Sequence, residues 1–111
     1  IHLKGPDEPA HDGDCDRKTE IISAIDEYFF GNLLPKIDLK DTLICITADH
    51  ATPCEMKIHS DTPVPLLISG GKLTSDGSQV FSEQECSKGS LGTLDYGYQL
   101  MPKLMQFLKN Q

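Results

Sequence analysis

The sequence predicts an α/β protein, because apolar runs typical of buried strands alternate with stretches of helical periodicity. Residues 43–47 and 64–69 are continuous apolar runs, and the first of them is rich in β-branched and apolar side chains. Apolar residues recur at helical spacing over residues 14–34 and again from Leu100 onwards. Continuous apolarity is typical of parallel strands covered on both faces by helices. We therefore expect few, mainly parallel strands with flanking helices.

The first 34 residues predict a strand end, a loop and one long helix. Residues 1–4 are short and largely apolar, whereas residues 5–13 are rich in Gly, Pro and Asp, which is typical of a loop. In the helix that follows, the apolar positions at helical spacing are Ile21, Ile22, Ile25 and Phe29. Asp14 or Asp16 is suited to cap the start of this helix, and Pro35 marks its end.

The remaining residues predict two strands, an irregular segment and a closing helix. The second apolar run stops at the Gly70-Gly71 pair. Residues 72–93 are polar and contain several Gly and Ser residues, which favours irregular structure. Leu100, Leu104 and Leu108 then repeat at helical spacing. A helix that begins near Leu100 tolerates Pro102 in its first turn.

Length and charge exclude several classes of protein. The chain has 111 residues, enough for one small domain, and a formal net charge of −7. An acidic surplus disfavours nucleic-acid binding, which needs a basic surface. No apolar run approaches the roughly 20 residues of a membrane span, and no signal peptide is visible. We expect a cytoplasmic protein that binds neither nucleic acid nor membrane.

Histidine and aspartate are concentrated in three short segments that could hold metal. Asp7 and His11 lie in the first, Asp49 and His50 follow the first apolar run, and His59 comes shortly after. Imidazole and carboxylate are mixed ligands that Zn, Mn, Fe and Co accept. These groups exceed what one tetrahedral site needs, so they predict a two-metal site of the kind that clamps a phosphoryl group. Taken singly, His11 or His59 could instead be a hydrogen-bonded loop histidine.

Three segments together resemble a known family. Residues 4–14 read KGPDEPAHDGD, residues 47–54 read TADHATPC, and residues 59–65 read HSDTPVP. In this order and spacing they resemble the archaeal-type 2,3-bisphosphoglycerate-independent (cofactor-independent) phosphoglycerate mutases of the alkaline phosphatase superfamily. The resemblance covers nearly the whole chain, since residues 85–92 and the closing helix are also similar to the C-terminal end of that family.

The resemblance implies a fold, a reaction and a set of metal ligands. The fold is the C-terminal part of an alkaline-phosphatase-like three-layer sandwich, with residues 1–111 forming the last segment of the catalytic domain. The reaction interconverts 3-phosphoglycerate and 2-phosphoglycerate through a phosphoserine intermediate in glycolysis and gluconeogenesis. Asp7, His11 and His59 would hold one divalent metal, and Asp49 and His50 would hold part of a second. Mn, Zn or Co suits these ligands, with Mg as an alternative.

The nucleophile is expected outside this chain. The resemblance places the phosphate-accepting serine, with a further aspartate ligand, near the N-terminus of the full protein. Thr52 and Ser60 are hydroxyls beside predicted ligands, but we expect Thr52 to bond local backbone and Ser60 to orient His59 or its loop. The chain alone is therefore expected to be inactive. Uncovered strand edges and helix faces also predict that it needs the missing N-terminal segment or self-association.

Two positions depart from the family pattern, and other readings remain open. Ala10 stands where Gly is usual, a minor steric change, and Thr62 stands where Asp is usual, although Asp61 is adjacent. One alternative is another phosphomutase or a metal-dependent phosphatase of the same superfamily. The other is a non-catalytic metal-binding fragment. Substrate-binding arginines would distinguish the enzymes, but Arg17 is the only arginine and is expected on a helix surface.

Overall fold

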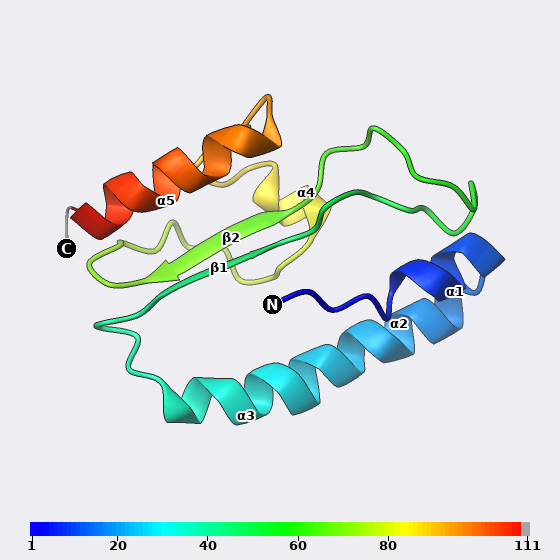
Figure 1. Cartoon of the computed structure of the whole chain (residues 1–111), viewed down its shortest axis with the longest axis horizontal. Coiled ribbons are helices and arrows are strands. Elements are labelled where there is room, and N and C mark those ends of the chain that lie inside the picture. Colours follow the sequence, from blue (N-terminus) through cyan, green and yellow to red (C-terminus); the bar gives the residue numbers. More distant parts are fainter. Residues whose placement is uncertain (110–111) are drawn as a thin grey trace. The chain divides into compact units, whose positions relative to one another are not determined.

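The chain forms two compact units, and the computed structural model describes residues 1–109. The first unit comprises residues 1–37 and 49–63, and the second comprises residues 38–48 and the chain from residue 64. Figure 1 shows that helices dominate the first unit, whereas the second contains a two-stranded ribbon and a closing helix.

The first unit contains a short helix and one long helix. Helix α1 spans Asp7–Asp12 and α2 spans Cys15–Ala24. Helix α2 continues without a break into a π-helical turn (Ile25–Phe30), then into α3 (Gly31–Leu33) and finally into a 3-10 turn (Leu34–Lys36). Figure 1 shows this continuation as one cyan helix. Asp14 caps it by accepting a 2.9 Å hydrogen bond from the Arg17 backbone N–H. The long helix predicted over residues 14–34 is thus confirmed, including its Asp14 cap.

Helix α1 was not predicted, because the Gly, Pro and Asp residues over residues 5–13 are typical of a loop. Pro9 occupies the first turn of α1, where its missing N–H removes no helical hydrogen bond. Asp7 and Glu8 also lie in that turn, where acidic side chains favour the positive end of the helix. Gly13 ends the helix with a left-handed φ of 79°, and its N–H donates to the Ala10 carbonyl.

The two strands of the second unit pair in the direction opposite to the predicted one. Strand β1 spans Leu43–Thr47 as expected, and β2 spans Leu66–Gly70 rather than starting at Val64. They are antiparallel, with Leu43 opposite Gly70 and Thr47 opposite Leu66. Parallel neighbours need a crossover, usually helical, and no helix forms in the described segment between β1 and β2. The expected mainly parallel sheet is therefore wrong for these strands, and residues 1–4 form no strand either.

The closing helix is confirmed, after a largely irregular segment. Helix α4 spans Glu83–Cys86, a 3-10 turn spans Gly97–Gln99, and α5 spans Leu100–Lys109. Lys103 on α5 donates a 3.3 Å hydrogen bond from its Nζ to the Leu91 carbonyl. Within residues 1–109, none of the helices combines the length and the apolarity needed to cross a membrane.

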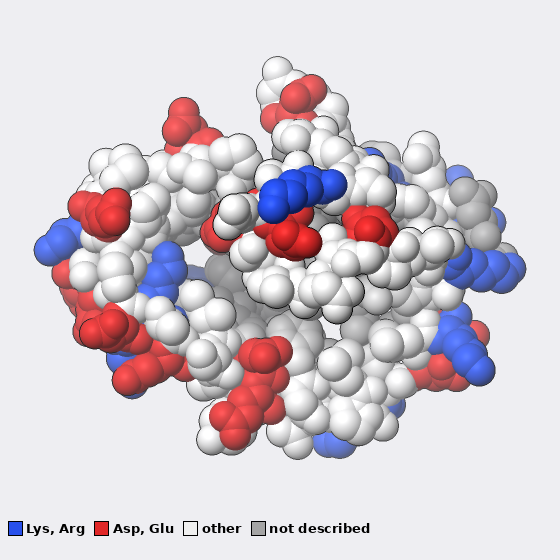
Figure 2. All heavy atoms as spheres, turned by 180° about the vertical axis from the view of Figure 1, so that it is seen from behind, with Lys and Arg blue, Asp and Glu red and all other residues white. Residues whose placement is uncertain are grey.

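The chain buries little apolar surface by itself. In the described part, Ala10 is fully buried, but no large side chain is. Many large apolar side chains are exposed, among them Tyr28, Leu34, Met101, Met105 and Leu108. Charged side chains of both signs are interspersed on the face shown in Figure 2. Burial of large apolar side chains is therefore limited in the described part of this chain.

Asp76 organises the irregular segment that follows β2. Its carboxylate accepts hydrogen bonds from the backbone N–H groups of Ser90, at 2.8 Å, and Ser78, at 3.1 Å. The bond from Ser90, followed by those from Ser78, lowers the pKa of the Asp76 carboxyl from 3.8 to about 2. The ionised carboxylate therefore ties two parts of this segment together.

We expect Asp76 to make the folded state sensitive to strong acid. Because its pKa is lowered on folding, its contribution to stability is complete above pH 3.8 and is lost as the pH falls through about 2. A ¹³C NMR titration of the Asp76 carboxyl should give a midpoint near 2. Asp76→Asn should remove this part of the pH dependence of unfolding. A midpoint at the ordinary value of 3.8 would contradict the contacts described.

Candidate metal centre

Helix α1 presents two of the predicted metal ligands on one face. Asp7 and His11 are separated by one helical turn, so their side chains project side by side. The His11 Nε2 atom lies 3.4 Å from the Asp7 Oδ1 atom. Both side chains are partly exposed, at 40% for His11 and 43% for Asp7, which leaves them accessible to an ion from solution.

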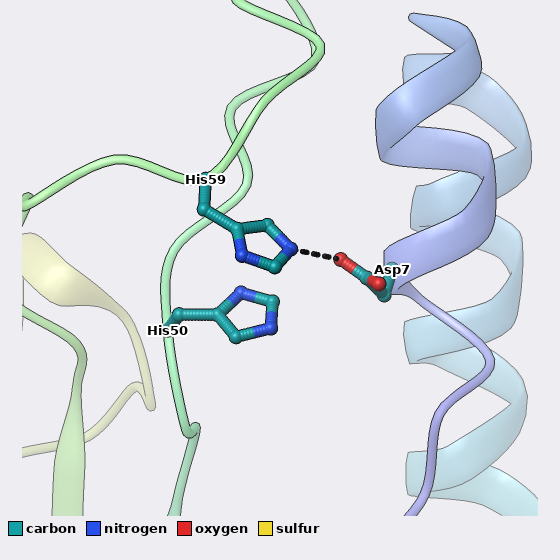
Figure 3. Close-up of side chains that lie close together, drawn as sticks. All are labelled: Asp7, His50 and His59. Carbon is teal, nitrogen blue, oxygen red and sulfur yellow. Dashed lines mark ion pairs between the residues drawn. The ribbon is translucent and has the colours of Figure 1, made fainter.

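A loop over residues 49–63 brings the other histidines together. The Ser60 backbone N–H donates a 2.9 Å hydrogen bond to the Ala51 carbonyl and closes the base of this loop. As a result, the His50 and His59 rings stack with centroids 3.6 Å apart. Figure 3 shows both rings extending from the loop toward Asp7 on α1.

Three ligand atoms converge at this point. His59 Nε2 lies 3.1 Å from His11 Nε2 and 3.6 Å from Asp7 Oδ1, the contact drawn as a dashed line in Figure 3. Ligands of a tetrahedral ion, bound at about 2.0–2.1 Å, stand about 3.3 Å apart. The observed separations are close to this value, and one carboxylate with two imidazoles suits Zn, Mn or Co. The residues present therefore fit a single divalent ion.

Backbone geometry orients His11 for this role. Its Nδ1 atom lies 2.9 Å from the Lys57 carbonyl oxygen. Because a carbonyl oxygen can only accept a hydrogen bond, Nδ1 must carry the proton, and the neutral His11 ring has its lone pair on Nε2. Ligand histidines are commonly oriented by such a bond to a backbone carbonyl. Lys57 itself has a left-handed backbone with φ of 57°, which is uncommon for a residue other than glycine. This conformation stands at a turn where the Met56 and Lys57 N–H groups both donate to the Pro53 carbonyl.

The second predicted pair lies in the same unit. Asp49 Oδ2 is 3.6 Å from His50 Nε2, and His50, Asp7 and His59 offer ligand atoms within 4.8 Å of one another. His2, which the sequence did not single out, places its Nε2 3.8 Å from Asp49 Oδ2. No motif surrounds His2, so only folding reveals its position. The structure thus brings Asp7, His11, His50 and His59 together, while Asp49 contacts the adjacent His50 and the additional histidine His2.

Thr52 connects the two groups of ligands. Its side-chain oxygen donates a 2.9 Å hydrogen bond to Asp7 Oδ1 and lies 3.1 Å from His50 Nδ1. The bond from Thr52 lowers the pKa of the Asp7 carboxyl below its usual 3.8; the three imidazoles act in the same direction, and desolvation opposes them. Asp7 is therefore held as an anion, the form that binds metal. The expectation that Thr52 bonds local backbone is wrong, because its partners are side chains.

The remaining hydroxyl and arginine behave as the sequence predicts. Ser60 donates a 2.9 Å hydrogen bond from its Oγ to Thr62 Oγ1 and so braces its own loop. Arg17 pairs with Glu20 at 3.1 Å on the exposed surface of α2. Neither residue presents a group to the converging ligand atoms.

The cluster of carboxylate and imidazole groups could hold a metal ion. Comparison with known proteins identifies the family of the chain. The model of the metalloenzyme superfamily matches residues 1–101. The chain therefore belongs to the metalloenzyme superfamily.

Its relatives include phosphoglycerate mutases, as the resemblance predicted. The chain is 41% identical over 110 residues to the 2,3-bisphosphoglycerate-independent phosphoglycerate mutase of Aeropyrum pernix, and 42% identical over 108 residues to that of Pyrococcus abyssi. These matches cover 97% of this chain but 26% of each relative, so the chain spans about a quarter of their length. The solved structure of the PH0037 protein from Pyrococcus horikoshii superposes with a TM-score of 0.92 at 39% identity, over 99% of this chain and 33% of the other.

We expect the left-handed backbone at Lys57 to contribute measurably to the stability of the loop. Glycine adopts a positive φ without steric cost, whereas β-branched valine is strongly disfavoured there. Lys57→Gly should therefore be more stable than Lys57→Val by about 1–3 kcal/mol in urea unfolding. The same pair of substitutions at Glu55, whose φ is not positive, is the matched control and should show no such advantage for glycine. Equal stabilities at position 57 would contradict the observed turn.

Proposed function

We propose that residues 1–111 form the C-terminal, metal-binding segment of a cofactor-independent phosphoglycerate mutase. The enzyme would interconvert 3-phosphoglycerate and 2-phosphoglycerate through a phosphoserine in glycolysis and gluconeogenesis. The observation that carries this proposal is the convergence of Asp7 Oδ1, His11 Nε2 and His59 Nε2 within 3.6 Å of one another. The mutase relatives at about 40% identity support the choice of reaction. In the complete enzyme, this segment would belong to an alkaline-phosphatase-like three-layer sandwich.

The chain's residues would divide between two metals. Asp7, His11 and His59 would hold one ion, and Asp49 and His50 would provide half of a second site that groups outside this chain complete. Mn, Zn or Co suits both ligand sets, with Mg as the alternative. When bound, such a pair of ions neutralises the charge of a phosphoryl group and activates a hydroxyl nucleophile. Residues 1–111 would therefore hold the positive charge of the ions near the phosphoryl group, while the serine that accepts the phosphate would come from the N-terminal part of the enzyme.

The chain alone is expected to lack turnover. Its two candidate hydroxyls are already engaged, Ser60 with Thr62 and Thr52 with Asp7. Its exposed apolar side chains, such as Met101 and Met105 on α5, suit contact with the missing N-terminal segment or with a second copy. We propose that the complete enzyme works in the cytoplasm. A phosphatase, another phosphomutase and a non-catalytic metal-binding fragment are the competing outcomes of the tests below.

We expect the purified chain to bind manganese at one tight and one weak site. Three ligand atoms converge at the first site, whereas the second has only two protein groups, so a titration should resolve two affinities. Asp7→Asn or His11→Asn should weaken the tight site by more than about 100-fold, beyond the usual cost of losing an outer-shell partner. Asp12→Asn is the matched control, because Asp12 lies exposed on the same helix.

Calorimetry with Mn²⁺ measures both affinities, and Asp49→Asn should affect the weak site alone. Two equally tight sites in the parent chain would contradict the proposed division of ligands. Binding that is unchanged by Asp7→Asn and His11→Asn would contradict the metal centre itself.

A chimera tests the reaction. We expect that grafting these 111 residues in place of the matching quarter of the Aeropyrum pernix relative yields an enzyme that interconverts the two phosphoglycerates. His59→Asn in the chimera should lower kcat by more than about 100-fold, because it removes a proposed metal ligand. Release of free phosphate instead of isomerised product would favour a phosphatase. A folded, metal-loaded chimera without either activity would favour a non-catalytic fragment.

A further inference from the structure

Thr52 is a buried polar residue in the middle of the metal centre, and the proposed ligand set does not include it. Its residue surface is 5% exposed, whereas the five proposed ligands are all more open to solvent. The Thr52 hydroxyl contacts Asp7 Oδ1 at 2.9 Å and His50 Nδ1 at 3.1 Å. It therefore joins one proposed ligand from each metal, although these two residues are far apart in the sequence.

The directions of these two hydrogen bonds follow from the number of protons available. A hydroxyl has one proton to donate, and an ionised carboxylate can only accept. The Thr52 proton must therefore go to Asp7, which leaves the Thr52 oxygen as an acceptor for His50. His50 then donates from Nδ1, so its neutral ring carries the lone pair on Nε2. That Nε2 atom is the one that lies 3.6 Å from Asp49 Oδ2.

We infer that Thr52 is a positioning residue that selects the Nδ1-protonated tautomer of His50 and so leaves the Nε2 lone pair, which lies near Asp49, available to the proposed second metal. A metal can bind only a nitrogen that carries a lone pair, and an outer hydrogen bond to the other nitrogen decides which one that is. The same hydroxyl also donates a hydrogen bond to Asp7, a proposed ligand of the first metal. One hydroxyl thus prepares ligands of both metals, and this role rests on the metal-binding function proposed above.

The position of Thr52 is held by contacts separate from the ligands. Lys18 on α2 donates a 2.8 Å hydrogen bond from its Nζ to the Thr52 carbonyl. The backbone of Thr52 is therefore anchored to α2, while its hydroxyl is free to satisfy the two ligands. A role as nucleophile does not fit, because the hydroxyl is buried and its proton is committed to Asp7.

Two substitutions separate the hydroxyl from the shape of the side chain. Thr52→Ser keeps the hydroxyl and loses a methyl group, whereas Thr52→Val keeps the shape and loses the hydroxyl. We expect Thr52→Val to weaken Mn²⁺ binding by about 10–100-fold in the full chain, the usual cost of removing a group that orients a ligand. Thr52→Ser should stay within about threefold of the parent chain, well inside that cost.

A second readout reports on the tautomer without any metal. Long-range ¹H–¹⁵N spectra of the metal-free protein should show His50 protonated at Nδ1 in the parent chain and in Thr52→Ser. In Thr52→Val this preference should be lost, because the acceptor for the Nδ1 proton is gone. A merely structural role of Thr52 would leave the tautomer of His50 unchanged.

The outcomes distinguish this inference from the proposed function. Unchanged Mn²⁺ affinity together with an unchanged His50 tautomer in Thr52→Val would overturn the inference. If the parent chain bound no Mn²⁺, the metal proposal would fail, and the tautomer spectra would still decide the role of Thr52. If Thr52→Val did not unfold cooperatively, Thr52→Ala would replace it in both measurements, with the same expected and contradicting results.

Discussion

The organisation of the candidate metal centre depends on the hydrogen bonds of Thr52. Through its hydroxyl it joins Asp7 on α1 to His50 in the loop, and through its carbonyl it accepts from Lys18 on α2. The neighbouring helices α1 and α2 therefore both meet, at one buried residue, a loop that is distant from them in sequence. Such a network matters in this chain because few apolar side chains are buried to hold the segments by packing.

Backbone turns set the remaining geometry. Gly13 ends α1 in a left-handed conformation, and a side chain there would collide with the Lys57 side chain. Lys57 adopts a left-handed conformation of its own and directs its carbonyl to His11. Gly13 adopts its conformation without steric cost, whereas the strain at Lys57 persists because the surrounding turn holds it. An ion bound as proposed would meet side chains whose directions are already determined, so less entropy would be lost on binding.

The exposed apolar surface of the chain agrees with the finding that the chain matches only part of its relatives. The chain spans about a quarter of its phosphoglycerate mutase relatives, and its strands form a ribbon of two rather than a covered sheet. Side chains such as Tyr28 on the long helix and Met101 on α5 remain exposed. A segment taken from a larger sandwich would show this pattern, because its apolar faces are normally covered by neighbouring layers. The polar metal centre lies within one compact unit and does not require that cover for its ligands to converge.

Local pattern was enough to determine the long helix with its Asp14 cap, strand β1 and the closing helix α5. The five candidate ligands, which the motifs and the family resemblance nominate, remain a prediction. Periodicity and capping act over a few residues, so a sequence displays them directly. Tertiary structure decided the antiparallel pairing of β1 with β2, since the direction of a pair depends on the path of the connection between the strands. It also decided the contact of Thr52 with Asp7 and that of His2 with Asp49, because the partners in each pair are distant in sequence. Hydrogen bonds between remote segments form only when the chain folds, and for that reason the sequence could nominate candidate ligands but not the contact between Thr52 and Asp7.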